Sequence, residues 1–277
     1  IHYICIINQY ISIIFCIFLC IQGNIKMNIK KHFLPLIDIV LDIIYPRHCY
    51  ICKKFIGNTS HQFLCYSCLH NLPLTRYEIC QHCGKSLGKG IPSLKRCPRC
   101  KNWHFSFSSV RSSGLYEKNL RKLILDLKFK KQYHLHYVLG KILIRHLKKY
   151  PFAKPFDVVI PVPMYFFDEI QRGYNHSYLL AKMVAKEWNI PFIPNLLRQT
   201  KRKKQQSTLS AQERKKNILG VFTVSPDLAQ NWQNKTVLLV DDVFTTGSTV
   251  QECTKVLKQA GILRVFVATV ACSHYDT

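Results

Sequence analysis

Two adjacent acids followed by a small, hydroxyl-rich turn are the residues of this chain best suited to chemistry. Asp241 and Asp242 follow the apolar run 236–240, which is typical of a buried strand. Apolar side chains at helical spacing come after the turn, and a second apolar run spans 264–270. We therefore expect a strand, a loop, a helix and another strand. The loop residues are Thr245, Thr246, Gly247, Ser248 and Thr249.

The expected loop has the chemistry of a phosphate site. Backbone N–H groups at a helix N-terminus attract anions, the hydroxyls add donors, and Gly247 lets the backbone approach a ligand closely. Asp241 and Asp242 would repel a phosphate, but they suit sugar hydroxyls or a nearby Mg²⁺ ion. The predicted ligand is a sugar phosphate, with its ribose diol on the acids. We also expect Ser248 or Thr249 to cap the helix and Gly261 to end it.

This stretch resembles the phosphoribosyl pyrophosphate (PRPP) signature of type I phosphoribosyltransferases. That signature is an apolar strand, two acids and then Thr-Thr-Gly-Ser-Thr. Strands that end in two acids also occur in receiver domains and in Walker B motifs. A receiver domain has no phosphate cradle directly after its acids, however, and the sequence contains no P-loop motif. The resemblance therefore favours a phosphoribosyltransferase-like fold, although it says much less about turnover.

Residues 49–100 carry four Cys-x-x-Cys pairs. Twelve residues separate the first two pairs and thirteen the last two, so each half has the spacing of a four-cysteine zinc ribbon. The stretch is too short and polar to build a core, so structural Zn²⁺ would supply its folding energy. Disulfides would need an exported chain. Successive pairing is favoured over crossed pairing, but spacing leaves both open. The predicted ligands are Cys49, Cys52, Cys65, Cys68, Cys80, Cys83, Cys97 and Cys100; the neighbouring His48, His61, His70 and His82 are expected outside the ligand set.

Between these two regions the sequence predicts a strand over 105–114 and helices near 120–127, 135–147 and 179–188. The run 157–163 predicts a strand that ends in a rigid Pro-x-Pro loop. In the transferases that the chain resembles, the loop at this place grips pyrophosphate. The Arg-Gly that begins at Arg172 is either a plain turn or an anion contact. The resemblance implies a pyrophosphate loop made of Pro161, Val162, Pro163 and Met164, with Arg172 close by.

The chain is strongly basic, with a net charge of +25 from 40 Lys and Arg against 15 Asp and Glu. Such a balance favours an anionic partner: nucleic acid, a nucleotide or an anionic membrane. The abundance of Ile, Asn and Lys is also typical of drift in an AT-rich genome, which we expect to account for about half of the charge. The most basic segment, 198–217, is either a solvated loop or a flap for nucleic acid or pyrophosphate.

The first residues present a separate question. Residues 4–21 are mostly apolar and at face value form a marginal transmembrane or signal-anchor segment. They lack a basic flank and precede the first Met, Met27, so we expect 1–26 to be translated upstream sequence or a weak hydrophobic extension. Membrane anchoring is therefore doubtful. The expected domains are 34–104, a double zinc ribbon with a lead-in helix, and 105–277, the phosphoribosyltransferase-like domain.

Taken together, residues 34–272 resemble the ComF family (ComFC/GntX type). The shared order is an apolar lead, a double zinc ribbon and a phosphoribosyltransferase-like domain. Two departures are His176, where the family usually has Gln, and the basic run 201–204. The matching residues are Pro46, the four Cys-x-x-Cys pairs and the segments 127–129, 161–163, 172–175, 198–209, 214–222 and 240–249.

The ComF resemblance implies an α/β fold: a type I phosphoribosyltransferase-like open, mostly parallel sheet with flanking helices, preceded by a small zinc-ribbon module. It also implies a PRPP site that works with Mg²⁺, and competence-type handling of single-stranded DNA for uptake or nutrition. Family members are cytoplasmic or peripheral at the inner membrane and can act with a helicase-like partner. These properties are expectations for this chain.

Three functional readings remain open. The chain is a DNA-handling module with a PRPP site, an active phosphoribosyltransferase that transfers the pentose to a nitrogen acceptor, or a decayed PRPP-sensing module. No nucleobase-binding hood is recognisable in the sequence, so we favour the first reading. Catalytic residues stay unassigned.

Overall fold

The computed structural model describes residues 48–56, 63–98, 100, 105–202 and 220–273. The chain divides into two compact units, one of residues 1–48 with 53–61 and one of residues 49–52 with 62–277. The expected N-terminal extension, the lead-in helix and most of the basic segment 198–217 lie outside the described residues. Within the described ranges, no helix is long and apolar enough to cross a membrane. Everything below concerns the second unit.

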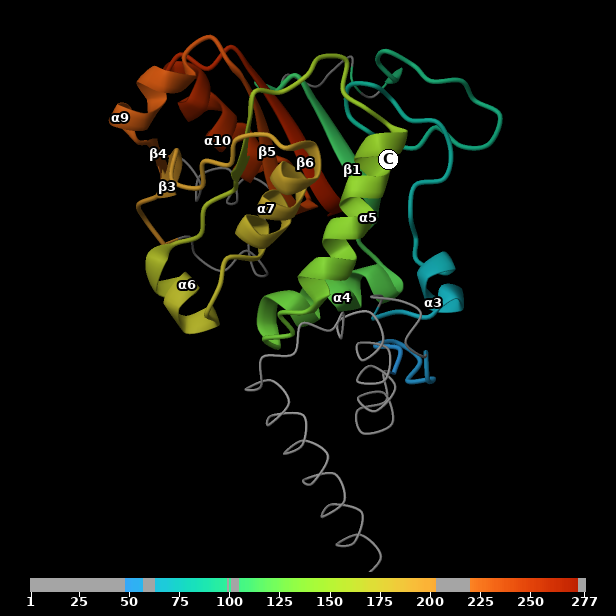
Figure 1. Ribbon diagram of the computed structural model, residues 1–277. Helices are drawn as coiled ribbons and strands as arrows, with labels where there is room; N and C mark the ends of the chain where they lie inside the picture. Colours follow the sequence, from blue (N-terminus) through green and yellow to red (C-terminus); the bar gives the residue numbers. More distant parts are fainter. Residues whose placement is uncertain (1–47, 57–62, 99, 101–104, 203–219, 274–277) are drawn as a thin grey trace, which may run out of the picture. The chain divides into compact units, whose positions relative to one another are not determined.

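A four-stranded parallel sheet forms the centre of this unit (Figure 1). Its apolar strands are almost entirely buried, which is typical of parallel sheets covered on both faces. A separate antiparallel pair joins β3 to β4. In spatial order the sheet contains β1 (Ser109–Leu115), β6 (Arg264–Cys272), β5 (Thr236–Phe244) and β2 (Val158–Pro161), and the pair contains β3 (Leu197–Gln199) and β4 (Phe222–Val224).

Helices cover both faces of the sheet. From α10, Val250 and Leu257 pack in one core cluster with Val237 and Leu239 of β5. Helices α5 and α7 lie in front of the sheet in Figure 1 and approach each other closely at Gly140. The predicted fold class is therefore confirmed. The helices are α3 (Tyr66–His70), α4 (Lys118–Phe129), α5 (Leu135–Lys149), α6 (Phe166–Arg172), α7 (His176–Trp188), α9 (Pro226–Ala229) and α10 (Ser248–Gln259), with a 3₁₀ turn at Gln230–Trp232.

The boundaries at the acid pair differ from the prediction in two ways. Strand β5 continues to Phe244, so both acids belong to the strand rather than to the loop. The N-cap of α10 is Gly247, and the predicted caps Ser248 and Thr249 are wrong, because both already lie inside the helix. Gly247 has a φ of 75°, and a Cβ at this position would lie 2.8 Å from the Phe244 ring. Glycine is required there on both counts. Gly261 follows the C-cap, as predicted.

Candidate functional site

The two carboxylates at the end of β5 are buried and meet side chains from two helices. Asp241 Oδ1 accepts hydrogen bonds from Ser177 Oγ at 2.8 Å and from the Asp242 backbone N–H at 2.9 Å. Asp242 Oδ2 lies 2.5 Å from Lys128 Nζ and 3.6 Å from His176 Nε2. Helix α4 therefore supplies a cation to this pair, and α7 supplies a hydroxyl and an imidazole.

The environments of the two acids shift their pKa values in opposite directions. Burial, together with the neighbouring Asp242 charge, raises the pKa of Asp241. Burial acts the same way on Asp242, but Lys128 and His176 outweigh it and hold the pKa of this carboxyl well below its ordinary range. Burial would lower the pKa of Lys128, yet the two carboxylates raise it. The centre of the site is a Lys128–Asp242 ion pair beside Asp241, whose charged form is disfavoured by burial and by the Asp242 charge.

The hydroxyl-rich loop follows these acids directly. Thr245 and Thr246 are exposed, whereas Gly247 is buried. Thr246 Oγ1 lies 2.8 Å from Ser248 Oγ and accepts a hydrogen bond from the Ser248 backbone N–H at 3.4 Å. Hydroxyls and the first amides of α10 are therefore presented together at a helix N-terminus, which is an arrangement that suits an anion.

The Pro-x-Pro loop is held beside the acids by Asn175. The Asn175 amide donates to the Val162 carbonyl at 3.2 Å, and its oxygen accepts from the Ser177 N–H at 2.9 Å, which caps α7. The Val162 N–H donates to the Val240 carbonyl at 2.8 Å, so it already belongs to the sheet. Pro161 and Pro163 have no N–H. Among the predicted pyrophosphate-loop residues, Met164 is left to offer an amide.

Arg172 ends α6 and lies close to the acids without touching them. Its Nη1 is 3.3 Å from Nδ1 of His176, whose other ring nitrogen faces Asp242. His176 therefore lies between the predicted Arg172 and the acid pair. It is also the position at which this chain departs from the ComF pattern.

Sequence reasoning missed two residues that build the site. Lys128 follows Ile124 by four positions and Leu127 by one, so it lies at the edge of the buried face of α4, a signal that was available. Ser177 carried no such signal, because only the folded chain brings the start of α7 to the end of β5.

The cysteines form two clusters of four, and each cluster joins successive pairs. Within each cluster the sulfur atoms lie within 4.8 Å of one another; one pair in the first cluster is separated by 3.6 Å and three pairs in the second by 3.7 Å. A tetrahedral zinc site with Zn–S bonds of about 2.3 Å requires sulfur separations of roughly 3.8 Å. No disulfide joins the ten cysteines that the structure describes. Cluster 1 is Cys49, Cys52, Cys65 and Cys68; cluster 2 is Cys80, Cys83, Cys97 and Cys100.

The clusters differ in how they are embedded. All four cysteines of cluster 2 are buried, whereas Cys52 of cluster 1 is exposed. Beside cluster 2, the carbonyl of His82 accepts from the Val110 N–H of β1 at 2.9 Å, and the carbonyl of Gln81 accepts from Arg111 Nη1 at 2.8 Å. Cluster 2 is therefore continuous with the edge of the sheet.

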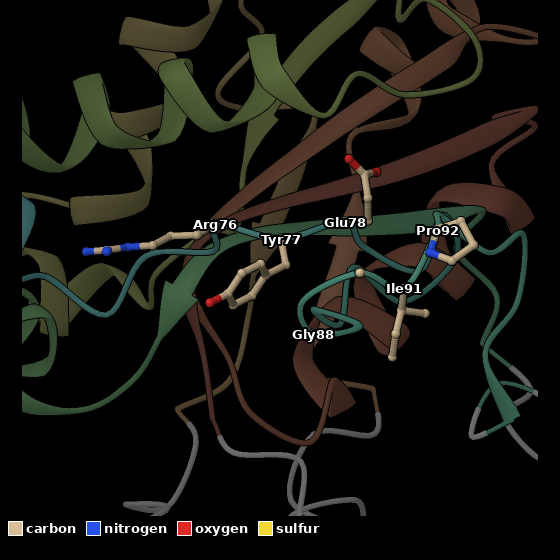
Figure 2. Close-up of a pocket in the computed structure, with 7 residues that line it drawn as sticks. Arg76, Tyr77, Glu78, Gly88, Ile91 and Pro92 are labelled. Atoms are coloured by element: carbon tan, nitrogen blue, oxygen red, sulfur yellow. The ribbon is translucent and has the colours of Figure 1, made fainter.

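A shallow hollow is lined by residues that precede and follow the first cysteine pair of cluster 2 in the sequence (Figure 2). In Figure 2, Tyr77 and Glu78 point in opposite directions, and Arg76 extends away from both. A ligand site needs polar groups that converge, so we place the candidate site at the acid pair instead. The lining residues are Arg76, Tyr77, Glu78, Gly88, Gly90, Ile91 and Pro92.

Two family matches agree with this architecture. The double zinc ribbon domain matches residues 40–101, and the phosphoribosyl transferase domain matches residues 175–276. The fold and the two cysteine clusters thus define a type I phosphoribosyltransferase-like domain behind a double zinc ribbon.

Curated relatives narrow the class to a family. Competence protein F of Haemophilus influenzae is 30% identical over 74% of this chain and 95% of its own length. DNA utilization protein YhgH of Salmonella typhi is 28% identical over 80% and 95%, and competence protein ComFC of Bacillus subtilis is 25% identical over 72% and 79%. The chain belongs to the ComF family of competence protein F.

Proposed function

We propose that this protein binds PRPP, or a closely related sugar phosphate, at the end of β5 and acts in the handling of single-stranded DNA. The observation that carries the binding site is the pair of buried carboxylates directly before the hydroxyl loop and the N-terminus of α10. The similarity to a competence protein and to a DNA utilization protein supports the role in DNA handling.

In this proposal the 5′-phosphate lies on the loop of Thr245, Thr246, Gly247, Ser248 and Thr249. The ribose hydroxyls face Asp241 and Asp242, and the Met164 amide and Arg172 meet the pyrophosphate. The carboxylates also fit Mg²⁺, which prefers oxygen ligands and would neutralise pyrophosphate charge when bound. Lys128 then exchanges part of its contact with Asp242 for the incoming anion.

Calorimetric titration of the zinc-loaded full chain with PRPP and Mg²⁺ tests the site. Loss of one hydrogen bond to a charged group is worth about 1.5–3 kcal/mol, so we expect Thr246→Val to weaken binding about tenfold or more. Thr223→Val, at another exposed threonine outside the loop, is the matched control and leaves affinity unchanged.

Failure of the folded, zinc-loaded protein to bind PRPP contradicts the proposed site. If PRPP binds, nucleobases and other nitrogen acceptors are added to the complex. This addition distinguishes an active transferase from a binding module without turnover. Release of pyrophosphate identifies a transferase, and binding without release identifies a module that holds the ligand without turnover.

A further inference from the structure

Four rings, three of them exposed and one half-buried, lie between the end of α4 and the first turn of α5. We call Phe129, Tyr133, His136 and Tyr137 the aromatic strip. Phe129 is 66% exposed, Tyr133 51% and Tyr137 36%. The Tyr133 and His136 ring centroids are 4.5 Å apart, and those of His136 and Tyr137 are 6.5 Å apart. Large rings exposed in succession are unusual unless they have something to contact.

The aromatic strip lies in the middle of a stretch that carries positive charge alone. Residues 128–149 contain no Asp or Glu, and Asp126, just before them, is buried against Lys130 Nζ at 2.9 Å and the Tyr50 hydroxyl at 2.9 Å. Seven cationic residues lie in this stretch. Three of them pair with carboxylates, Lys128 with Asp242, Lys130 with Asp126 and Lys148 with Glu187, and the other four are Lys131, Lys141, Arg145 and Lys149.

Cations also lie over the rings themselves. The Arg172 guanidinium carbon is 5.1 Å from the Phe129 ring centroid, and Lys141 Nζ is 4.5 Å from that of Tyr137. The strip thus combines flat apolar faces with positive charge within a few ångströms, and the described side chains add no exposed carboxylate between residues 128 and 149.

A second pair of exposed rings lies on α6, and it differs from the aromatic strip in the charges that surround it. Phe166 and Phe167 of α6 are 65% and 64% exposed, as much as Phe129. Asp168 and Glu169 follow them on the same short helix, and Asp168 pairs with Arg202 at 2.8 Å. This patch mixes both signs of charge, so it lacks the electrostatic preference of the aromatic strip.

We propose that the aromatic strip binds single-stranded nucleic acid, with bases stacked on its rings and phosphates on the surrounding lysines. Unpaired bases offer both faces to aromatic side chains, and a positive groove follows the backbone without reading sequence. The choice of nucleic acid as ligand rests on the proposed role in DNA handling, whereas the location rests on the exposure and charge of the strip. Bases in a duplex are stacked on one another, so duplex binds more weakly.

Fluorescence anisotropy with labelled oligo-dT and oligo-U tests the proposal on the zinc-loaded full chain. Stacking is worth at least about 1 kcal/mol per base, or about fivefold per ring, so Phe129→Ala with Tyr133→Ala weakens binding about 30-fold. The matched control, Phe166→Ala with Phe167→Ala, removes two equally exposed phenylalanine rings and leaves affinity within twofold. Thermal melting of all variants verifies that the fold is retained.

A charge variant provides an independent readout. Each phosphate contact contributes about 0.7 to the slope of log K against log salt for single strands. Lys131→Gln with Lys141→Gln therefore lowers the slope by about 1.4 without touching buried Asp126. Lys186→Gln with Lys258→Gln, two exposed lysines outside the strip, leaves the slope unchanged.

The outcomes separate this inference from the proposed function. If the strip variants bind oligonucleotide as tightly as wild type, or if the α6 control loses as much affinity as they do, the aromatic strip is not the binding surface. The proposed role in DNA handling is unaffected by either result. A folded protein that binds neither oligonucleotide overturns both. The PRPP titration is a separate measurement, so its result does not decide the strip. The oligo-dT and oligo-U affinities show whether DNA or RNA is preferred.

Discussion

Cysteine cluster 2 gathers buried thiols, and the acid pair of β5 gathers buried carboxylates. The negative charge of the two sites is neutralised in different ways. Cluster 2 brings four buried sulfur atoms together at the spacing of a zinc site, so we expect a bound metal ion to neutralise its thiolates. The acid pair has its own cation, Lys128 at 2.5 Å from Asp242. We therefore expect the ribbon to need zinc in order to fold, whereas the acid pair carries its neutralising cation within the chain.

The largest expected effect comes from breaking cluster 2. Cys83→Ser should abolish its zinc site and, because His82 and Gln81 are bonded to β1, cost more than about 4 kcal/mol of unfolding free energy. Zinc content by mass spectrometry and urea denaturation measure both effects. Cys52→Ser, at the exposed cysteine of cluster 1, is the control and should cost clearly less stability. Equal losses would contradict the claim that cluster 2 is structurally continuous with the sheet.

Breaking the internal ion pair should come next. Asp242→Asn leaves Lys128 charged and largely buried without its carboxylate, which costs about 3–5 kcal/mol. Adding Lys128→Met removes the orphaned charge and should recover most of that loss in a double-mutant cycle followed by urea denaturation. If Lys128→Met gave no recovery, the internal cation would not be what neutralises the pair.

The acid pair and cluster 2 should also respond differently to a fall in pH. The pKa of Asp242 is depressed in the folded state, so its stabilisation is present above the ordinary carboxyl pKa of about 4 and is lost as pH falls through the folded value. The stability difference between wild type and Asp242→Asn should therefore shrink as pH falls below about 4. Zinc binding by cluster 2 requires thiolates, so the cluster should release its zinc at a pH above about 4. A zinc-sensitive dye measures this release.

The smallest effect should have the opposite sign. The pKa of Asp241 is raised, mainly by burial and by Asp242, so its charged form is disfavoured in the folded protein. Asp241→Asn keeps an oxygen acceptor for Ser177 and the Asp242 N–H, and it should stabilise the ligand-free protein by about 0.5–2 kcal/mol. Differential scanning calorimetry at pH 7 measures this gain. A loss of stability would mean that the Asp241 charge is needed by Lys128.

Local patterns predicted much of this molecule. The spacing of the cysteine pairs predicted two clusters, and the apolar runs with their neighbouring helices predicted a parallel sheet with the acids at a strand end. The contacts that complete the site could not be predicted this way. The spacing of α4 places Lys128 at the edge of its buried face, but its partner Asp242 is known only from the folded chain, and Ser177 and Asn175 reach β5 and the Pro-x-Pro loop only after α7 has packed. The N-cap was missed because the Phe244 ring, which excludes a side chain at position 247, acts through three-dimensional proximity.

For the proposed sugar-phosphate site, the Lys128–Asp242 contact also predicts the order in which metal and ligand bind. A tethered ammonium competes with any free divalent cation at an effective concentration of millimolar or more, as for other intramolecular partners. We therefore expect a dilute free metal ion not to displace Lys128 from Asp242. A metal ion already bound to pyrophosphate brings an anion with it, and Lys128 can pair with that anion instead of Asp242. Metal and sugar phosphate should enter together, and calorimetry with the metal alone should record almost no heat at concentrations where the mixture binds.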